Sequence, residues 1–234
     1  MKTIGVIGGI GPQATMDFEA RVHAISQRLI PQSANSGYPP MVVYYHRALP
    51  FMLDEHRKPL LPLQPDPQLT AKLDKLGEMV DFVVITSNAT HMFRDIIEET
   101  TGRKVLSMID ITLQEVQRLG WRKVGVLGFG EPKVYTSEMA RLGIAYEVLA
   151  GEIGGLRDKL DQAIHAVMMG QAGPADSKLA MEAVDTLRAR GVDGIILGCT
   201  EIPLLMGDAA QAPDLINPLE LLAEAAVKFA IQDL

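Results

Sequence analysis

An internal repeat constrains the fold of this chain more strongly than any other feature of its sequence. The segment VDFVVITSN, residues 80–88, aligns with VDGIILGCT, residues 192–200, which begins 112 positions later. An amphipathic helical pattern precedes each copy. A second pair, IGVIGG from Ile4 and VGVLGFG from Val124, aligns at 120 positions. Two pairs in the same order indicate two related halves.

Apolar runs of strand length alternate with longer segments of helical period along the whole chain. We predict strands at residues 3–8, 41–45, 80–85, 105–109, 124–128, near 146 and at 194–197. We predict helices at about 14–29, 68–79, 92–100, up to 119, and at 136–142, 155–169, 176–190 and 219–231. Runs such as FVVI and GIIL are apolar at every position, which is typical of parallel strands covered by helices. The predicted class is α/β.

The composition excludes several functional classes. The chain has 234 residues, of which 47% are hydrophobic, enough for one large domain or two small ones. The net charge of -7, without a basic run, argues against nucleic-acid binding. No apolar stretch reaches the roughly 20 residues of a membrane span, and the start lacks a signal-peptide pattern. We expect a cytoplasmic protein that binds neither nucleic acid nor membrane.

The repeat makes Ser87 and Cys199 equivalent, each just beyond the carboxyl end of a buried strand. α/β folds place ligands at this end of their strands. If the two halves face one another across a cleft, these side chains approach opposite sides of one bound molecule. We therefore predict a site in that cleft, for a reaction that uses both faces of the bound molecule.

Cys199 is the single cysteine, and Thr200 and Glu201 follow it in GCTEIPLL. Helix N-termini and cationic neighbours lower a thiol pKa from about 8.5, so we expect a thiolate that removes a substrate proton. The alternative is an inert buried cysteine. The histidines share no metal-ligand spacing, and we predict no metal.

The segment GGIGPQAT, residues 8–15, follows the first predicted strand. Its glycines let the backbone approach a ligand, and the helix N-terminus offers free N–H groups to an anion. We predict substrate contacts from Gly9, Ile10, Gly11 and Thr15. The alternative is a tight turn with no ligand.

The segment TSNATHM, residues 86–92, follows the other copy of the repeat. Asn88 and Thr90 are predicted donors to a substrate carboxylate. His91 is a helix-start residue, an acid or a surface side chain. The alternative is helix capping by Ser87 or Thr90.

A nicotinamide enzyme is a competing hypothesis, because Gly9, Gly11 and Ala14 fit G-x-G-x-x-A. The following strand, MVVYYHRAL, ends without the acidic residue that holds a ribose, although Arg47 is suited to a 2′-phosphate. This hypothesis leaves Cys199 and the repeat unexplained.

Through IGVIGGIGPQAT, SNATH and LGCTEIPLL the chain resembles the aspartate/glutamate racemase family over nearly its whole length. That family includes aspartate, glutamate and hydantoin racemases, maleate isomerases and arylmalonate decarboxylases. The resemblance implies two pseudo-symmetric flavodoxin-like domains with the site in the cleft between them, and no cofactor. We place the domains at residues 1–111 with 216–234 and at 112–215. Relatives of this fold often dimerise, so we expect a homodimer.

In the family one thiol takes the α-proton and a second returns a proton. Carried over by position, Cys199 is the second catalytic cysteine, and Asn88 and Thr200 bind a carboxylate. Ser87 stands where the first cysteine belongs, and a hydroxyl is a far weaker acid than a thiol. Ala89 stands where a threonine usually follows the asparagine, and we predict that Ala89 and Glu201 also contact the substrate.

The segments that bind the second carboxylate in aspartate racemases also differ in this chain. The family has Pro-Asp-Arg and Val-Lys-x-Gly segments, whereas this chain has ALPFMLDEHR and VMMG. Arg47 or Arg57 is the candidate replacement.

The leading hypothesis is a racemase for a small amino acid or dicarboxylate, with Cys199 and Ser87 as catalytic residues. A second is a one-cysteine isomerase or decarboxylase of the same superfamily. A third is a carboxylate binder without catalysis.

Overall fold

The computed structural model describes residues 1–34, 36–56 and 58–232, and the chain divides into two compact units. Unit 1 comprises Met1–Met108 and Leu222–Leu234, and unit 2 comprises Ile109–Leu221. The boundaries predicted from the sequence follow residues 111 and 215. The compact units divide after Met108 and after Leu221, inside the helices Met108–Arg118 and Pro218–Ala230.

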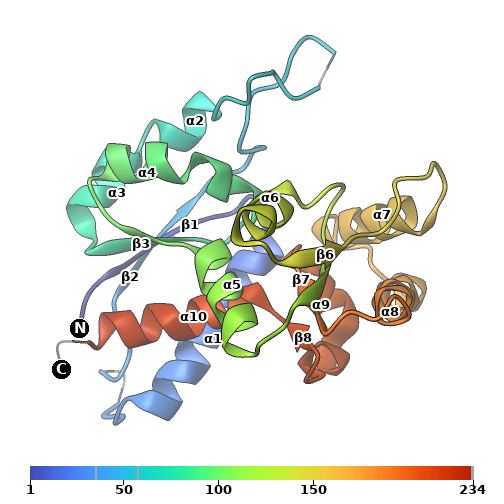
Figure 1. Ribbon diagram of the computed structural model, residues 1–234. Helices are drawn as coiled ribbons and strands as arrows, with labels where there is room; N and C mark the ends of the chain where they lie inside the picture. Colours follow the sequence, from blue (N-terminus) through green and yellow to red (C-terminus); the bar gives the residue numbers. More distant parts are fainter. Residues whose placement is uncertain (35, 57, 233–234) are drawn as a thin grey trace. The chain divides into compact units, whose positions relative to one another are not determined.

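Unit 1 contains a parallel four-stranded sheet in the order β2-β1-β3-β4. Its strands are β1 (Ile4–Gly8), β2 (Met41–Tyr45), β3 (Phe82–Ile85) and β4 (Val105–Leu106). Its helical segments are α1 (Pro12–Leu29), α2 (Pro67–Thr70), α3 (Leu73–Met79), η1 (Ala89–Phe93) and α4 (Arg94–Thr101), with most of α10 (Pro218–Ala230). In Figure 1, α3 and α4 lie on one side of the sheet, and α1 and α10 on the other.

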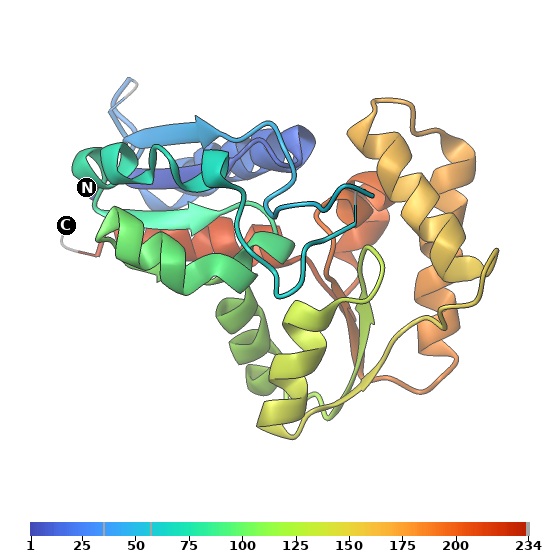
Figure 2. The ribbon, with the colours of Figure 1, turned by 90° about the horizontal axis from the view of Figure 1, so that it is seen from above.

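Unit 2 contains a second parallel four-stranded sheet, in the order β6-β5-β7-β8. Its strands are β5 (Lys123–Leu127), β6 (Ala145–Glu147), β7 (Gly194–Leu197) and β8 (Leu215–Ile216). Its helical segments are α5 (Met108–Arg118), α6 (Lys133–Leu142), α7 (Leu156–Met168), α8 (Pro174–Arg188), α9 (Glu201–Met206) and η2 (Gly207–Gln211). Figure 2 shows α7 and α8 on one side of this sheet and α5 and α6 on the other. The predicted class, parallel sheets flanked by helices, is confirmed.

The two sheets share one topology and one register. Ile4 of β1 pairs with Phe82 of β3, and Val124 of β5 pairs with Gly194 of β7. The first residues of these pairs are 120 positions apart and the second 112, which are the two offsets of the repeat. The structural equivalence of the halves therefore extends to individual strand positions.

Each sheet is covered by apolar side chains because successive strand residues point to opposite faces. In unit 2, Ile195 and Leu197 pack in the core formed with α7 and α8, while Ile196 packs in the core formed with α5 and α6. In unit 1, Ile7 and Ile85 pack against residues of α3 and α4. These clusters of buried side chains hold the ends of the strands in place.

The structure differs from the predicted elements in three respects. The strand predicted at 105–109 ends at Leu106, and α5 begins at Met108, because a short apolar run fits a buried strand or a buried helix equally well. The helix predicted at 68–79 is interrupted between α2 and α3. The segments η1, α9, η2 and β8 were not predicted as separate elements. Within the described ranges, no helix is long and apolar enough to cross a membrane.

Candidate active site

The predicted site residues of unit 1 lie at the carboxyl edge of its sheet. They follow three adjacent parallel strands: Gly9, Ile10 and Gly11 after β1, Arg47 after β2, and Ser87, Asn88, Ala89 and Thr90 after β3. Arg47 is exposed, and its guanidinium carbon lies 4.7 Å from the centre of the Tyr45 ring. Arg57 lies outside the described residues.

Thr15 holds the glycine loop of unit 1 in place. Its hydroxyl oxygen accepts a hydrogen bond from the Gly9 N–H at 2.9 Å and lies 2.9 Å from the hydroxyl of Thr86 at the end of β3. Gly9 has a φ of +80°, and a Cβ there would lie 2.8 Å from the Tyr45 ring, so the loop requires glycine. Because Thr15 is fully buried, its hydroxyl connects the loop to β3 inside the unit.

The backbone and side chain of Ser87 have separate partners. Its hydroxyl oxygen accepts a hydrogen bond from the Thr90 hydroxyl at 2.9 Å, and its carbonyl oxygen lies 2.8 Å from Nδ1 of His91. Nε2 of His91 accepts the Met108 N–H at 3.0 Å. A carbonyl only accepts and an amide only donates, so His91 is neutral with its proton on Nδ1. Both ring nitrogens are engaged, and the buried ring is not a base for the Ser87 hydroxyl.

Cys199 lies at the equivalent strand end in unit 2, just beyond β7. The preceding residue, Gly198, donates its N–H to the Leu127 carbonyl of β5 at 2.6 Å. A Cβ on Gly198 would lie 2.8 Å from that carbonyl oxygen and 3.1 Å from the Tyr135 ring. Glycine therefore lets the backbone approach β5 and α6 closely, which fixes the position of Cys199.

Cys199 is hydrogen-bonded to a buried carboxylate. Its Sγ donates to Oε2 of Glu201 at 3.0 Å, and the Thr200 hydroxyl donates to the same oxygen at 3.1 Å. Glu201 is only 2% exposed. Burial raises the pKa of the Cys199 thiol well above its usual value, and the charge and hydrogen bond of Glu201 raise it further. The expected lowering of this pKa is therefore wrong, because the sequence does not show where the Glu201 side chain points.

Two residues near the thiol were missed by the sequence analysis. The backbone of Phe129 acts to lower the pKa of Cys199, which opposes the effect of burial. Tyr135 is fully buried, and its pKa is raised mainly by that burial. Phe129 and Tyr135 are 120 positions after Gly9 and Thr15, so the repeat offset was the available signal.

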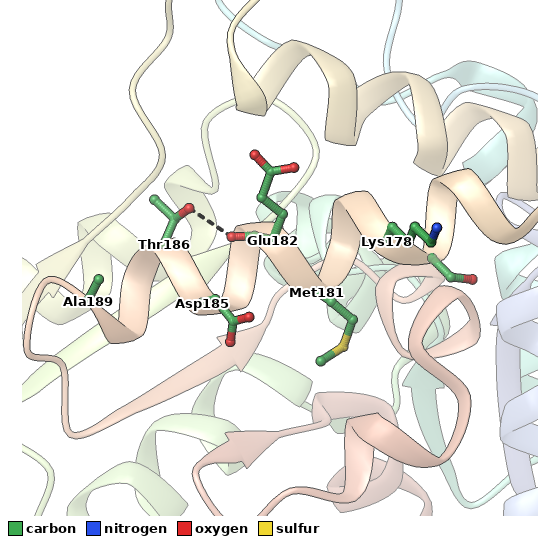
Figure 3. A pocket seen from close by; sticks show the side chains of 7 residues that line it. Lys178, Met181, Glu182, Asp185, Thr186 and Ala189 are labelled. Atoms are coloured by element: carbon green, nitrogen blue, oxygen red, sulfur yellow. Dashed lines mark hydrogen bonds between the residues drawn. The ribbon is translucent and has the colours of Figure 1, made fainter.

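A shallow hollow of about 660 Å³ lies along α8, apart from the predicted site residues. Its lining comes from one helix: Ser177, Lys178, Met181, Glu182, Asp185, Thr186 and Ala189. In Figure 3, Met181 and Asp185 point to one side of α8, and Glu182 and Thr186 to the other. Across the described part of the chain, no group of three His, Cys, Asp or Glu side chains is arranged to hold a metal ion.

The fold and the strand-end residues together define a duplicated α/β protein with a buried thiol in one half and a hydroxyl at the equivalent place in the other. The sequence model of the Asp/Glu/hydantoin racemase family matches residues 7–226. The chain belongs to this family, as its motifs indicated.

Known relatives agree with this assignment. The chain is 24% identical to the broad specificity amino-acid racemase RacX of Bacillus subtilis strain 168, over 96% of both chains. The structure of the Picrophilus torridus aspartate racemase superposes with a TM-score of 0.77 at 21% identity, over 98% of this chain and 94% of that one. An aspartate racemase homologue from Pyrococcus horikoshii OT3 gives a TM-score of 0.76 at 21% identity, over 99% and 100%. These structural matches share the fold with this chain.

Proposed function

We propose that the protein is an amino-acid racemase in which the Cys199 thiol moves the α-proton of a small amino acid, with aspartate and glutamate as the first substrates to test. The observation that carries the proposal is the 3.0 Å hydrogen bond from Cys199 Sγ to the buried Glu201 carboxylate. A carboxylate in this position is able to receive the thiol proton and to return it.

The proton steps on one face of the α-carbon balance within this pair. Inversion also requires a proton on the opposite face, and the proposal assigns that step to Ser87 or a water that it holds. The thiol proton passes to Glu201, and the resulting thiolate takes the α-proton while the electron pair of the broken C–H bond moves into the substrate carboxyl group. In the reverse sense, the S–H bond breaks and its proton goes to the planar carbon. The backbone of Phe129 stabilises the thiolate during either step.

The proposal assigns binding of the substrate carboxylates to the strand ends of unit 1 and to Thr200. Arg47 is an exposed cation after β2, and Asn88 and the loop from Gly9 to Gly11 lie at the same sheet edge. Thr90, like Thr15, is fully buried and hydrogen-bonded within its unit. These two threonines support the loops that carry the binding groups. The proposed chemistry requires no cofactor.

One-sided chemistry is a second candidate, and the surroundings of Ser87 favour it. The hydroxyl of Ser87 is paired with the hydroxyl of Thr90, and both ring nitrogens of His91 are engaged elsewhere. A serine hydroxyl without an adjacent base does not take up an α-proton near neutral pH. Cys199 alone would then serve an isomerase or decarboxylase that protonates a planar intermediate from one side.

The test is α-proton exchange in D2O, measured by NMR on the L and D forms of aspartate and glutamate, with chiral chromatography on the same samples. Exchange with inversion that disappears in Cys199→Ala supports the racemase. Exchange without inversion supports one-sided chemistry. If no substrate exchanges, or if Cys199→Ala exchanges at the wild-type rate, the proposal is wrong for these amino acids.

The proposal includes a homodimer, because relatives of this fold often dimerise. Light scattering on a size-exclusion column measures the mass directly. A mass near the monomer value of 25.5 kDa contradicts this part of the proposal.

A further inference from the structure

We infer that Asp161 and His165 of α7 are positioning residues for Cys199, acting through the loop between β5 and α6. The loop comprises residues 128–132. The inference depends on the proposed function only for the catalytic role of Cys199. The positioning itself is a property of unit 2 and is testable without any substrate.

The loop lies beside the thiol because of the register between β5 and β7. Leu127 pairs with Leu197, and the Gly198 N–H donates to the Leu127 carbonyl at 2.6 Å. Two residues further on, the backbone of Phe129 acts on the thiol in the direction that lowers its pKa. An N–H directed at sulfur stabilises the thiolate more than the thiol, so the position of the loop affects the acidity of Cys199.

Two side chains of α7 contact two successive residues of this loop, Phe129 and Gly130. The Gly130 N–H donates to Oδ1 of Asp161 at 2.9 Å, and the Phe129 ring stacks on the His165 ring with centres 4.9 Å apart and planes at 27°. Asp161 and His165 are four residues apart on α7, so they lie on one face of the helix. Both contacts of α7 therefore lie within three residues of Leu127, whose carbonyl holds Gly198 next to Cys199.

The equivalent loop of unit 1 is held differently. There the Gly9 N–H is bonded by Thr15, which belongs to the helix that follows the loop. The counterpart of Thr15 in unit 2 is Tyr135, a fully buried ring whose hydroxyl pairs with Thr112. In unit 2, Asp161 of α7 accepts the N–H of Gly130, the position equivalent to Ile10, so a side chain from a different helix holds this loop.

Charged and titratable groups lie near Cys199 and near Asp161. Glu201 and Tyr135 face Cys199. Arg157, Asp158 and His165 surround Asp161, whose own pKa is raised by burial and held back by the Gly130 N–H and the two bases. Asp158 accepts the Gly154 N–H at 2.9 Å, outside the loop, and carries the same charge one turn earlier on α7. It is a matched control.

The single cysteine makes the test direct, since alkylation by iodoacetamide reports on Cys199 alone. The rate is measured from about pH 6 to pH 11 on the full chain, because the midpoint gives the thiol pKa while the plateau reports access. We expect Asp161→Ala to raise the midpoint by about half a unit or more, which makes alkylation about threefold slower at a fixed pH below it. Asp161→Asn keeps an acceptor oxygen for Gly130 and is expected to leave the midpoint near that of wild type.

His165→Ala and His165→Phe form a second pair, because phenylalanine preserves the stack on Phe129. We expect the alanine variant to raise the midpoint and the phenylalanine variant to retain the wild-type value, which keeps the inference testable if Asp161→Ala does not fold. Midpoints of Asp161→Ala and His165→Ala that match Asp158→Ala would overturn it. Loss of α-proton exchange in wild type would count against the proposed function alone.

Discussion

The thiol of Cys199 donates its proton toward the Glu201 carboxylate across 3.0 Å, and Glu201 is almost completely buried. A buried carboxylate beside a thiol opposes formation of a second negative charge. The resting Cys199 is therefore a protonated thiol with a proton acceptor in contact. This arrangement suits a group that both gives and takes a proton.

Glu201→Gln tests this relationship through pH. Burial and the Glu201 charge both raise the thiol pKa, so removing the charge while keeping the shape lowers it. We expect the midpoint of iodoacetamide alkylation to fall to a lower pH, with faster alkylation at a fixed pH below the midpoint. An unchanged or higher midpoint would show that Glu201 does not set the acidity of Cys199. Glu220→Gln, on α10, removes the same charge elsewhere and serves as control.

Ser87→Cys tests the role of the second strand end. A thiol ionises far more readily than a hydroxyl, so a cysteine there supplies a second acid–base group. We expect inversion of the preferred amino acid to become at least about tenfold faster relative to exchange without inversion. Chiral chromatography beside NMR exchange gives this ratio. A ratio unchanged from wild type contradicts a role for position 87 in proton transfer, and Ser177→Cys controls for a new thiol elsewhere.

His91→Leu tests the connection between Ser87 and the start of α5. Leucine removes the donor to the Ser87 carbonyl and the acceptor for the Met108 N–H. Two buried backbone groups lose a partner, so we expect a loss of about 2–5 kcal/mol in the free energy of unfolding. Urea denaturation measures this loss. The control is His23→Leu, since His23 is exposed and its Nδ1 lies 2.7 Å from the carbonyl oxygen of Glu19, one turn before it. Equal effects of the two variants contradict the prediction.

Thr15→Val tests whether this threonine supports the glycine loop. The hydroxyl accepts the Gly9 N–H and pairs with Thr86, so its removal leaves two buried polar groups without their partner. We expect Thr15→Val to lower the free energy of unfolding by about 1–3 kcal/mol. We expect Thr15→Ser to have nearly the stability of wild type, because serine keeps the hydroxyl oxygen. Denaturant melts compare the two variants. Equal stability of Thr15→Val and Thr15→Ser would contradict the structural role.

Much of the fold is predictable from the internal repeat. Its two offsets, 112 and 120, equal the spacings between the paired residues of β1 with β3 and of β5 with β7. The central strands are predictable from the sequence, because a strand buried on both faces has apolar residues at every position. The short elements α9 and β8 were not predictable in this way. With six residues in α9 and two in β8, neither is long enough to show a periodic pattern of apolar residues.

The sequence by itself determined the α/β class, the duplicated topology, the family, and the placement of Ser87 and Cys199 just beyond equivalent strands. Only the tertiary structure decided what surrounds those residues: the Glu201 carboxylate against the thiol, the neutral His91 between Ser87 and Met108, and Asp161 on the Gly130 amide. The reason is physical. Periodic burial is a local property of the chain, whereas a pKa or a tautomer depends on partners that packing brings together from distant positions.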